Sequence, residues 1–75
     1  MKKLKIQTFM SVIDVEAKEV SSMAEMTERN GFYLYNGECY YVGLACDVGR
    51  TCSTGNYDNK GRKLYACKFE VRSVA

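Results

Sequence analysis

The chain has 75 residues, a formal net charge of +2, and no histidine, tryptophan or proline. This length suffices for one small domain, residues 1–75, and the apolar content is too high for a disordered chain. The absence of histidine excludes every catalytic arrangement that shuttles a proton through imidazole, and no paired arrangement of other side chains suggests catalysis. We therefore expect a protein that is not an enzyme.

The N-terminal segment is basic but does not have the pattern of a signal peptide, because Lys5, Gln7 and Asp14 interrupt its apolar run. No apolar stretch approaches the ~18 residues that a membrane span needs. These features predict a cytoplasmic protein without a membrane contact.

The first half of the chain predicts a strand and then a helix. Residues 3–13 alternate between apolar and polar side chains, as in a half-buried strand. Residues 15–29 place Val20 and Met23 on one face at helical spacing, and Asn30-Gly31 is a typical helix stop. This pattern predicts a helix over residues 15–29.

An alternative stays open for the start of this helix. Ile13, Val15 and Ala17 also alternate with charged residues, which is the pattern of a strand. In that case the strand continues to Ala17, and a shorter helix begins at Ser22.

The clearest local signal is the segment "GFYLYNGECYYVG", in which two aromatic runs flank Asn36-Gly37. This pair favours a two-residue type I′ hairpin turn. Cross-strand partners share a face, so such a turn assigns each side chain to one of two faces. We expect a core face of Phe32, Leu34, Cys39 and Tyr41, and an outer face of Tyr33, Tyr35, Glu38, Tyr40 and Val42.

The second half predicts a long loop and a last strand. Residues 44–62 are rich in glycine, asparagine, aspartate, serine and threonine, which indicates a turn-rich loop. Residues 63–74 alternate as a strand. The length of the first and last strands favours their pairing, while the strand order stays open. The whole order predicts an α+β domain, in which a small antiparallel sheet of about four strands carries one helix on one face.

The four cysteines, Cys39, Cys46, Cys52 and Cys67, lack the C-x₂-C spacing of zinc sites. Cys39 and Cys67 fall on predicted core faces, where a thiol behaves as a small apolar side chain. The pattern favours four free thiols over a Cys46–Cys52 disulfide or a zinc site, so we expect no metal and no cofactor.

The tyrosine-rich outer face of the hairpin is the candidate site. Tyrosine is enriched in protein interfaces, and residues 50–75 hold six basic residues against two acidic ones. The expected partner-binding residues are Tyr33, Tyr35, Tyr40, Arg50, Tyr57, Lys60, Arg62 and Lys63. In the alternative interpretation, the helix or a loop packs over these tyrosines and they belong to the core.

Two functions fit this surface. The first is binding to a protein partner, in the manner of a small inhibitor such as a phage accessory or anti-defence protein, an analogy of size and type alone. The second is nucleic-acid binding, with tyrosines stacked on bases and basic residues against phosphates.

Overall fold

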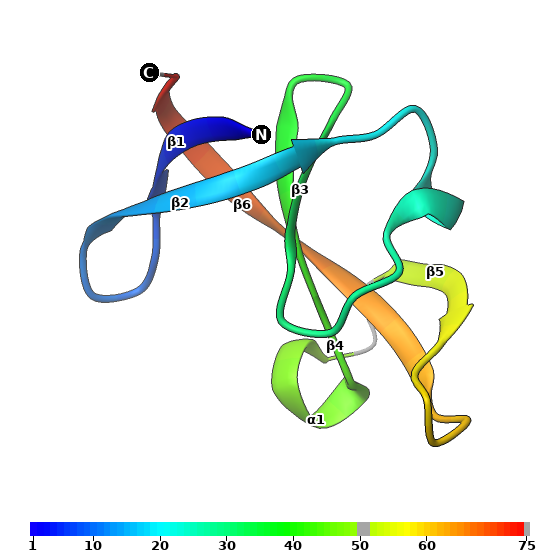
Figure 1. Ribbon diagram of the computed structural model, residues 1–75. Helices are drawn as coiled ribbons and strands as arrows, with labels where there is room; N and C mark the ends of the chain where they lie inside the picture. Colours follow the sequence, from blue (N-terminus) through cyan, green and yellow to red (C-terminus); the bar gives the residue numbers. More distant parts are fainter. Residues whose placement is uncertain (50–51, 75) are drawn as a thin grey trace.

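The computed structural model describes residues 1–49 and 52–74 and shows a mostly β protein (Figure 1). The strands of this part are β1 (Lys2–Gln7), β2 (Val12–Glu19), β3 (Phe32–Tyr35), β4 (Glu38–Gly43), β5 (Cys52–Tyr57) and β6 (Lys63–Val74). Its helical elements are a 3₁₀ turn, η1 (Met23–Glu25), and a short helix, α1 (Ala45–Val48). The predicted α+β domain with a helix on one face of a sheet is therefore wrong.

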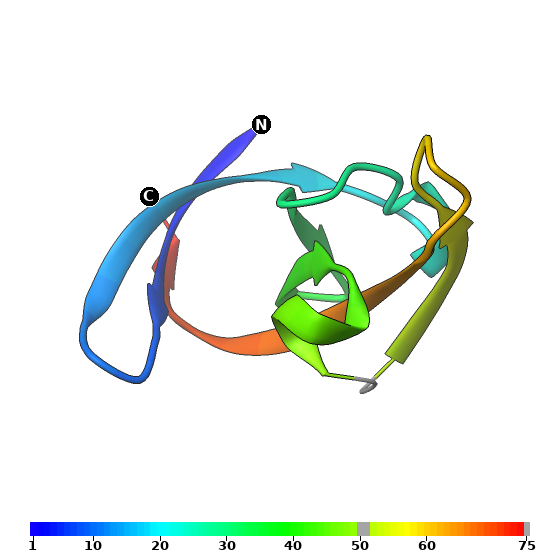
Figure 2. The ribbon, with the colours of Figure 1, turned by 90° about the horizontal axis from the view of Figure 1, so that it is seen from below.

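Five of the strands close into a barrel in the order β1-β2-β3-β4-β6, because β6 pairs back with β1. Figure 2 shows this ring from below. All neighbours in the ring are antiparallel except β2 and β3, which are parallel. The predicted pairing of the first and last strands is confirmed, with Leu4 opposite Val74. The additional strand β5 lies on the first part of β6.

The Asn36-Gly37 hairpin is confirmed in its register. Tyr35 lies opposite Glu38, and Phe32 lies opposite Tyr41. Asn36 and Gly37 have φ angles of 53° and 77°, the left-handed values that a type I′ turn requires at both positions.

The predicted helix over residues 15–29 is wrong, and the alternative of a continued strand describes its start better. Val15 and Ala17 belong to β2, where Ala17 is fully buried inside the barrel and Val15 packs beside it. The predicted strand over residues 3–13 is also wrong as one element, since a turn at residues 8–11 divides it into β1 and β2.

The predicted loop over residues 44–62 contains α1 and β5. Two side chains attach β5 to the rest of the chain. The Thr54 hydroxyl donates to the Leu64 carbonyl at 3.1 Å. The Asn56 side-chain amide donates to the Ala24 and Met26 carbonyls at 2.8 and 3.1 Å. Polar residues here form a strand that pairs with β6, and their side chains bond to the backbone of β6 and of the segment around η1.

Two hydrophobic cores lie on opposite faces of the sheet that β3, β4 and β6 share. The barrel interior holds Leu4, Ile6, Ala17 and Cys39. The second core holds Met26, Tyr33, Val42, Leu44, Leu64 and Ala66. Consecutive residues of a strand point to opposite faces, so β4 contributes Cys39 to the first core and Val42 to the second.

Candidate functional site

The expected tyrosine face is largely covered. Tyr33 is only 3% exposed and lies in the second core, where its hydroxyl accepts a hydrogen bond from the Glu28 N–H at 2.9 Å. Tyr35 and Tyr40 are half-buried against the same core, with ring centroids 6.3 Å apart. Tyr33 therefore follows the alternative interpretation of the sequence, in which these tyrosines belong to the core, because the segment after β2 packs over this face.

Tyr40 has a polar environment at the edge of this core. Its hydroxyl donates to Glu38 Oε2 at 3.1 Å, and Glu38 Oε1 lies 3.3 Å from Lys68 Nζ. Desolvation and the neighbouring Glu38 carboxylate raise the pKa of Tyr40. Tyr40 is therefore a neutral hydrogen-bond donor.

The basic residues of the predicted site lie elsewhere, on the β5–β6 hairpin. Tyr40 lies opposite Lys68 on β6, whereas Tyr57 lies opposite Lys63. Lys63 and Lys68 are about 17 Å apart along an extended strand. The structure therefore separates the tyrosines of β3 and β4 from Tyr57, Lys60, Arg62 and Lys63, and Arg50 lies outside the described residues.

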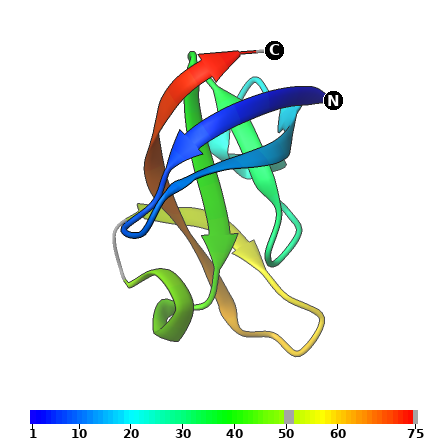
Figure 3. The ribbon, with the colours of Figure 1, turned by 90° about the vertical axis from the view of Figure 1, so that its left-hand side faces the viewer.

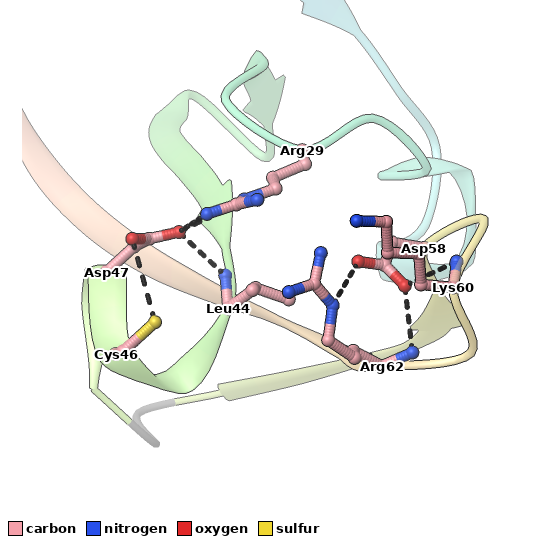
Figure 4. A network of polar contacts seen from close by, with 7 residues as sticks. All are labelled: Arg29, Leu44, Cys46, Asp47, Asp58, Lys60 and Arg62. Carbon is pink, nitrogen blue, oxygen red and sulfur yellow. Dashed lines mark hydrogen bonds and ion pairs between the residues drawn. The ribbon is translucent and has the colours of Figure 1, made fainter.

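Asp58 organises the turn of the β5–β6 hairpin (Figure 4). Its Oδ1 accepts hydrogen bonds from the N–H groups of Lys60 and Arg62 at 3.0 and 2.8 Å, and its Oδ2 lies 2.8 Å from Arg62 Nε. These contacts lower the pKa of Asp58, with the Arg62 N–H as the largest cause. Arg62 therefore stabilises this turn through its contacts with Asp58. Tyr57, in contrast, is 61% exposed.

A second polar cluster in Figure 4 joins the segment before β3 to α1. Arg29 Nη2 lies 3.0 Å from Asp47 Oδ2, and the Leu44 N–H donates to the same oxygen at 3.3 Å. The Arg29 guanidinium and the Leu44 N–H lower the pKa of Asp47. This arrangement explains the start of α1, and each charge in it already has a protein partner.

The most exposed apolar side chains of the described residues lie at the turn between β1 and β2. Phe9 and Met10 are 107% and 93% exposed, and Val12 and Ile13 at the start of β2 are also exposed. Figure 3 shows the β1–β2 hairpin lying across the barrel with its turn at one side. We call residues 8–11 the apolar tip. The sequence interpretation missed it by placing Phe9 inside a continuous strand.

Hydrogen bonds of Thr8 and Gln7 close the turn at the apolar tip. The Thr8 N–H and hydroxyl both donate to the Ser11 carbonyl at 2.8 Å, and the Thr8 hydroxyl accepts from the Met10 and Ser11 N–H groups. The Gln7 side chain donates to the Thr8 carbonyl at 2.9 Å. Thr8 followed by Ser11 was the available sequence signal, since such side chains stabilise turns without glycine.

The apolar tip adjoins an aromatic part of the barrel. A shallow groove of about 340 Å³ lies between the tip and β6, and its lining is Gln7, Thr8, Phe9, Cys67, Lys68, Phe69 and Glu70. Phe69 continues into a row of rings, with its centroid 6.4 Å from that of Tyr41 and Tyr41 5.1 Å from Phe32. The tip and the groove together form one apolar surface.

The cations near this surface are neutralised by carboxylates. Lys5 Nζ lies 2.8 Å from Asp14, Arg72 Nη1 lies 3.3 Å from Glu70, and Lys68 lies beside Glu38. Exposed pairs of this kind contribute little to stability. Their consequence here is an apolar surface with balanced charges at its border.

Cys39 is buried, Cys46 and Cys52 are exposed, and all four cysteines are free thiols. Within residues 1–49 and 52–74, no three acidic or cysteine side chains gather in a way that could hold a metal ion. In the same part of the chain, no helix has the length and apolar character needed to cross a membrane. The chain matches no protein family, no curated protein and no solved structure.

Proposed function

We propose that this domain acts by binding a protein partner through the apolar tip, without catalysing a reaction. The observation that carries the proposal is the full exposure of Phe9 and Met10 on a turn that hydrogen bonds of Thr8 close. These two side chains contribute nothing to either core. Contiguous exposed apolar side chains of this size are typical of interaction sites, so a binding role explains them best.

An apolar tip on a hydrogen-bonded turn suits insertion into a concave apolar pocket of another protein. Burying a side chain of this size contributes about 1.5–3 kcal/mol, and a preorganised turn loses little conformational entropy on binding. A small domain that fills a pocket of a larger protein can block that pocket, which agrees with an inhibitor.

The charges favour a protein over a lipid surface. An apolar loop that binds an anionic membrane needs unpaired cations beside it. The cations closest to this tip, Lys5, Lys68 and Arg72, all lie within 3.3 Å of a carboxylate.

Nucleic-acid binding remains a second candidate function because of the β5–β6 hairpin. There the exposed Tyr57 lies opposite Lys63 and close in sequence to Lys60. This hairpin and the apolar tip lie on opposite sides of the molecule (Figures 1 and 2), so separate variants can test the two surfaces.

The test begins with a photoreactive phenylalanine analogue at position 9, which captures the partner from a lysate of the source organism. The captured protein is purified, and its affinity is measured for the unmodified chain and for Phe9→Ser, Met10→Ser and Tyr57→Ser. We expect the two tip variants to weaken binding about tenfold or more, the scale of an interface hot spot. Tyr57→Ser is the matched control, an exposed aromatic residue on the other hairpin.

The thermal midpoints of these variants should equal that of the unmodified chain, because the substituted side chains are exposed. Normal binding by Phe9→Ser and Met10→Ser would refute the proposal. If Tyr57→Ser alone weakened binding to the captured protein, the binding site would be the β5–β6 hairpin. Nucleic-acid binding is measured separately with a single-stranded oligonucleotide, whose affinity should fall with Tyr57→Ser and steeply with added salt if the second function holds.

A further inference from the structure

Strand β2 extends well beyond its neighbour β3. β2 has eight residues, and Val12 through Ala17 pair with β1, but β3 pairs with only Ala17, Lys18 and Glu19. Residues 12–16 therefore have a paired edge toward β1 and an open edge on the other side. Figures 1 and 2 show this half of β2 leading away from β3 toward the apolar tip.

The register identifies the backbone groups on the open edge. The Thr8 N–H donates to the Ser11 carbonyl, so residues 8 and 11 form a hydrogen-bonded pair of the hairpin. Such pairs alternate with non-hydrogen-bonded ones, and Asp14 opposite Lys5 is of the second kind. The N–H and C=O of Val12 and Asp14 therefore point away from β1, where β3 does not reach.

The side chains along this edge have two characters. Ile13 and Val15 are on the side of the barrel interior, together with Ala17, whereas Asp14 and Glu16 are on the outer side. A hollow of about 520 Å³ follows this part of the hairpin, and its lining is Lys3, Leu4, Lys5, Asp14, Val15 and Glu16. A strand added here would meet apolar side chains on one face and carboxylates on the other.

These carboxylates argue against a second copy of the chain as the occupant. Antiparallel self-pairing over the whole open edge places Asp14 opposite Asp14 or opposite Glu16. Like charges directly opposite each other destabilise a pair of strands. Asp14 already pairs with Lys5 at 2.8 Å, whereas Glu16 forms no ion pair with another described residue. The outer side of this edge therefore complements a strand that carries lysine or arginine, chiefly through Glu16.

We propose that the open edge of β2, residues 12–16, accepts an extended segment of the protein partner by β-strand addition. The segment alternates apolar residues, which face Ile13 and Val15, with basic residues, which face Asp14 and Glu16. Main-chain hydrogen bonds to Val12 and Asp14 supply the affinity in such a mode, and the alternating side chains supply the specificity. The inference rests on the proposed protein-binding function and identifies a recognition element next to the apolar tip.

The test uses a displayed library of random peptides, about ten residues long so that they exceed a typical strand length, selected on the immobilised full chain. We expect the selected peptides to alternate apolar residues with lysine or arginine. Their affinity is then compared for the unmodified chain, Asp14→Pro and Asp14→Ala. Both variants lose the ion pair with Lys5, but only proline removes the N–H from the open edge.

Asp14→Pro should weaken peptide binding by about tenfold relative to Asp14→Ala, as expected for a lost main-chain pairing. Proline is tolerated at this position because the Asp14 N–H makes no bond to β1. If Asp14→Pro unfolds, the inference is tested instead by amide hydrogen exchange of the unmodified chain with and without peptide. Bound peptide should then protect the Val12 and Asp14 amides.

Selected peptides that bind Asp14→Pro as well as Asp14→Ala, or that leave the Val12 and Asp14 amides unprotected, would overturn the inference. A library that yields no binder would overturn it as well. None of these outcomes decides whether the apolar tip binds a protein. That proposed function is tested independently, by the affinity of Phe9→Ser for the captured partner.

Discussion

Tyr33 shows how one side chain can serve either as an interface or as a core residue. Its ring is buried among Met26, Val42 and Leu64, and its hydroxyl satisfies the Glu28 N–H. Gly31 makes room for this ring, because a Cβ there would lie 3.1 Å from Tyr33 Cε2. Tyr33 therefore stabilises the fold.

We predict that Tyr33→Phe lowers the free energy of unfolding by about 1 kcal/mol, since it removes the part-buried hydrogen bond from the Glu28 N–H. Tyr33→Ala should cost about 3–5 kcal/mol, the range for removing a buried aromatic ring. Urea unfolding measures both, with Tyr57→Phe as an exposed control that should not change stability. A Tyr33→Ala variant as stable as the unmodified chain would show that the ring is not in a core.

At the scale of the element, the β1–β2 turn and the β5–β6 turn, on opposite sides of the molecule, are stabilised by different side chains. The apolar tip is held by a threonine hydroxyl and exposes Phe9 and Met10. The β5–β6 turn is held by Asp58, whose side chain is only 8% exposed and accepts three hydrogen bonds. Only the second turn depends on an ionised group.

We predict that this dependence makes the β5–β6 hairpin sensitive to acid. The pKa of Asp58 is below its ordinary value of 3.8, so its contribution to stability is present above that value and is lost as the pH falls through the folded-state pKa. Asp58→Asn should therefore be less stable than the unmodified chain at neutral pH, with a difference that shrinks in acid. Urea unfolding at about pH 7 and pH 3, on either side of the ordinary carboxyl pKa, measures this.

Asp14→Asn is the matched control for Asp58→Asn. The Asp14 side chain is exposed and its pair with Lys5 is a surface ion pair, which contributes little. An Asp58→Asn difference that stayed constant between the two pH values would contradict the role of the ionised carboxylate.

At the scale of the whole molecule, closure of the barrel determines which cysteine side chains are accessible to solvent. Cys39 is fully buried inside the ring, and desolvation raises the pKa of its thiol to about 11. Cys46 on α1 and Cys52 at the start of β5 are exposed. The cysteines of this chain thus differ in solvent accessibility, because Cys39 lies inside the barrel and Cys46 and Cys52 lie outside it.

We predict that iodoacetamide modifies Cys39 on the order of 100-fold more slowly than Cys46 and Cys52, because Cys39 requires opening of the barrel and is protonated at neutral pH. Mass spectrometry of digested samples gives the rate for each cysteine. In denaturing urea the rates should become similar. Equal rates in the native protein would mean that the ring formed by β1 and β6 is not closed.

Local chemistry made several features predictable from the sequence. Asn36-Gly37 determines the β3–β4 turn and register, since both positions need left-handed backbone that these two residues adopt readily. The alternation of residues 63–74 identifies β6, the longest strand, and the length of the terminal strands predicted their pairing.

Only the tertiary structure decided the remaining features. The sequence around Val15 and Ala17 fits both a helix and a strand. These residues adopt the strand conformation of β2 because their side chains then help to fill the barrel interior. The hairpin register placed Tyr33, Tyr35 and Tyr40 on one face, but what packs over that face depends on residues distant in sequence. The same holds for the apolar tip and the open edge of β2. Each of these surfaces is exposed because no other described segment packs against it, and local sequence patterns do not show which segments pack together.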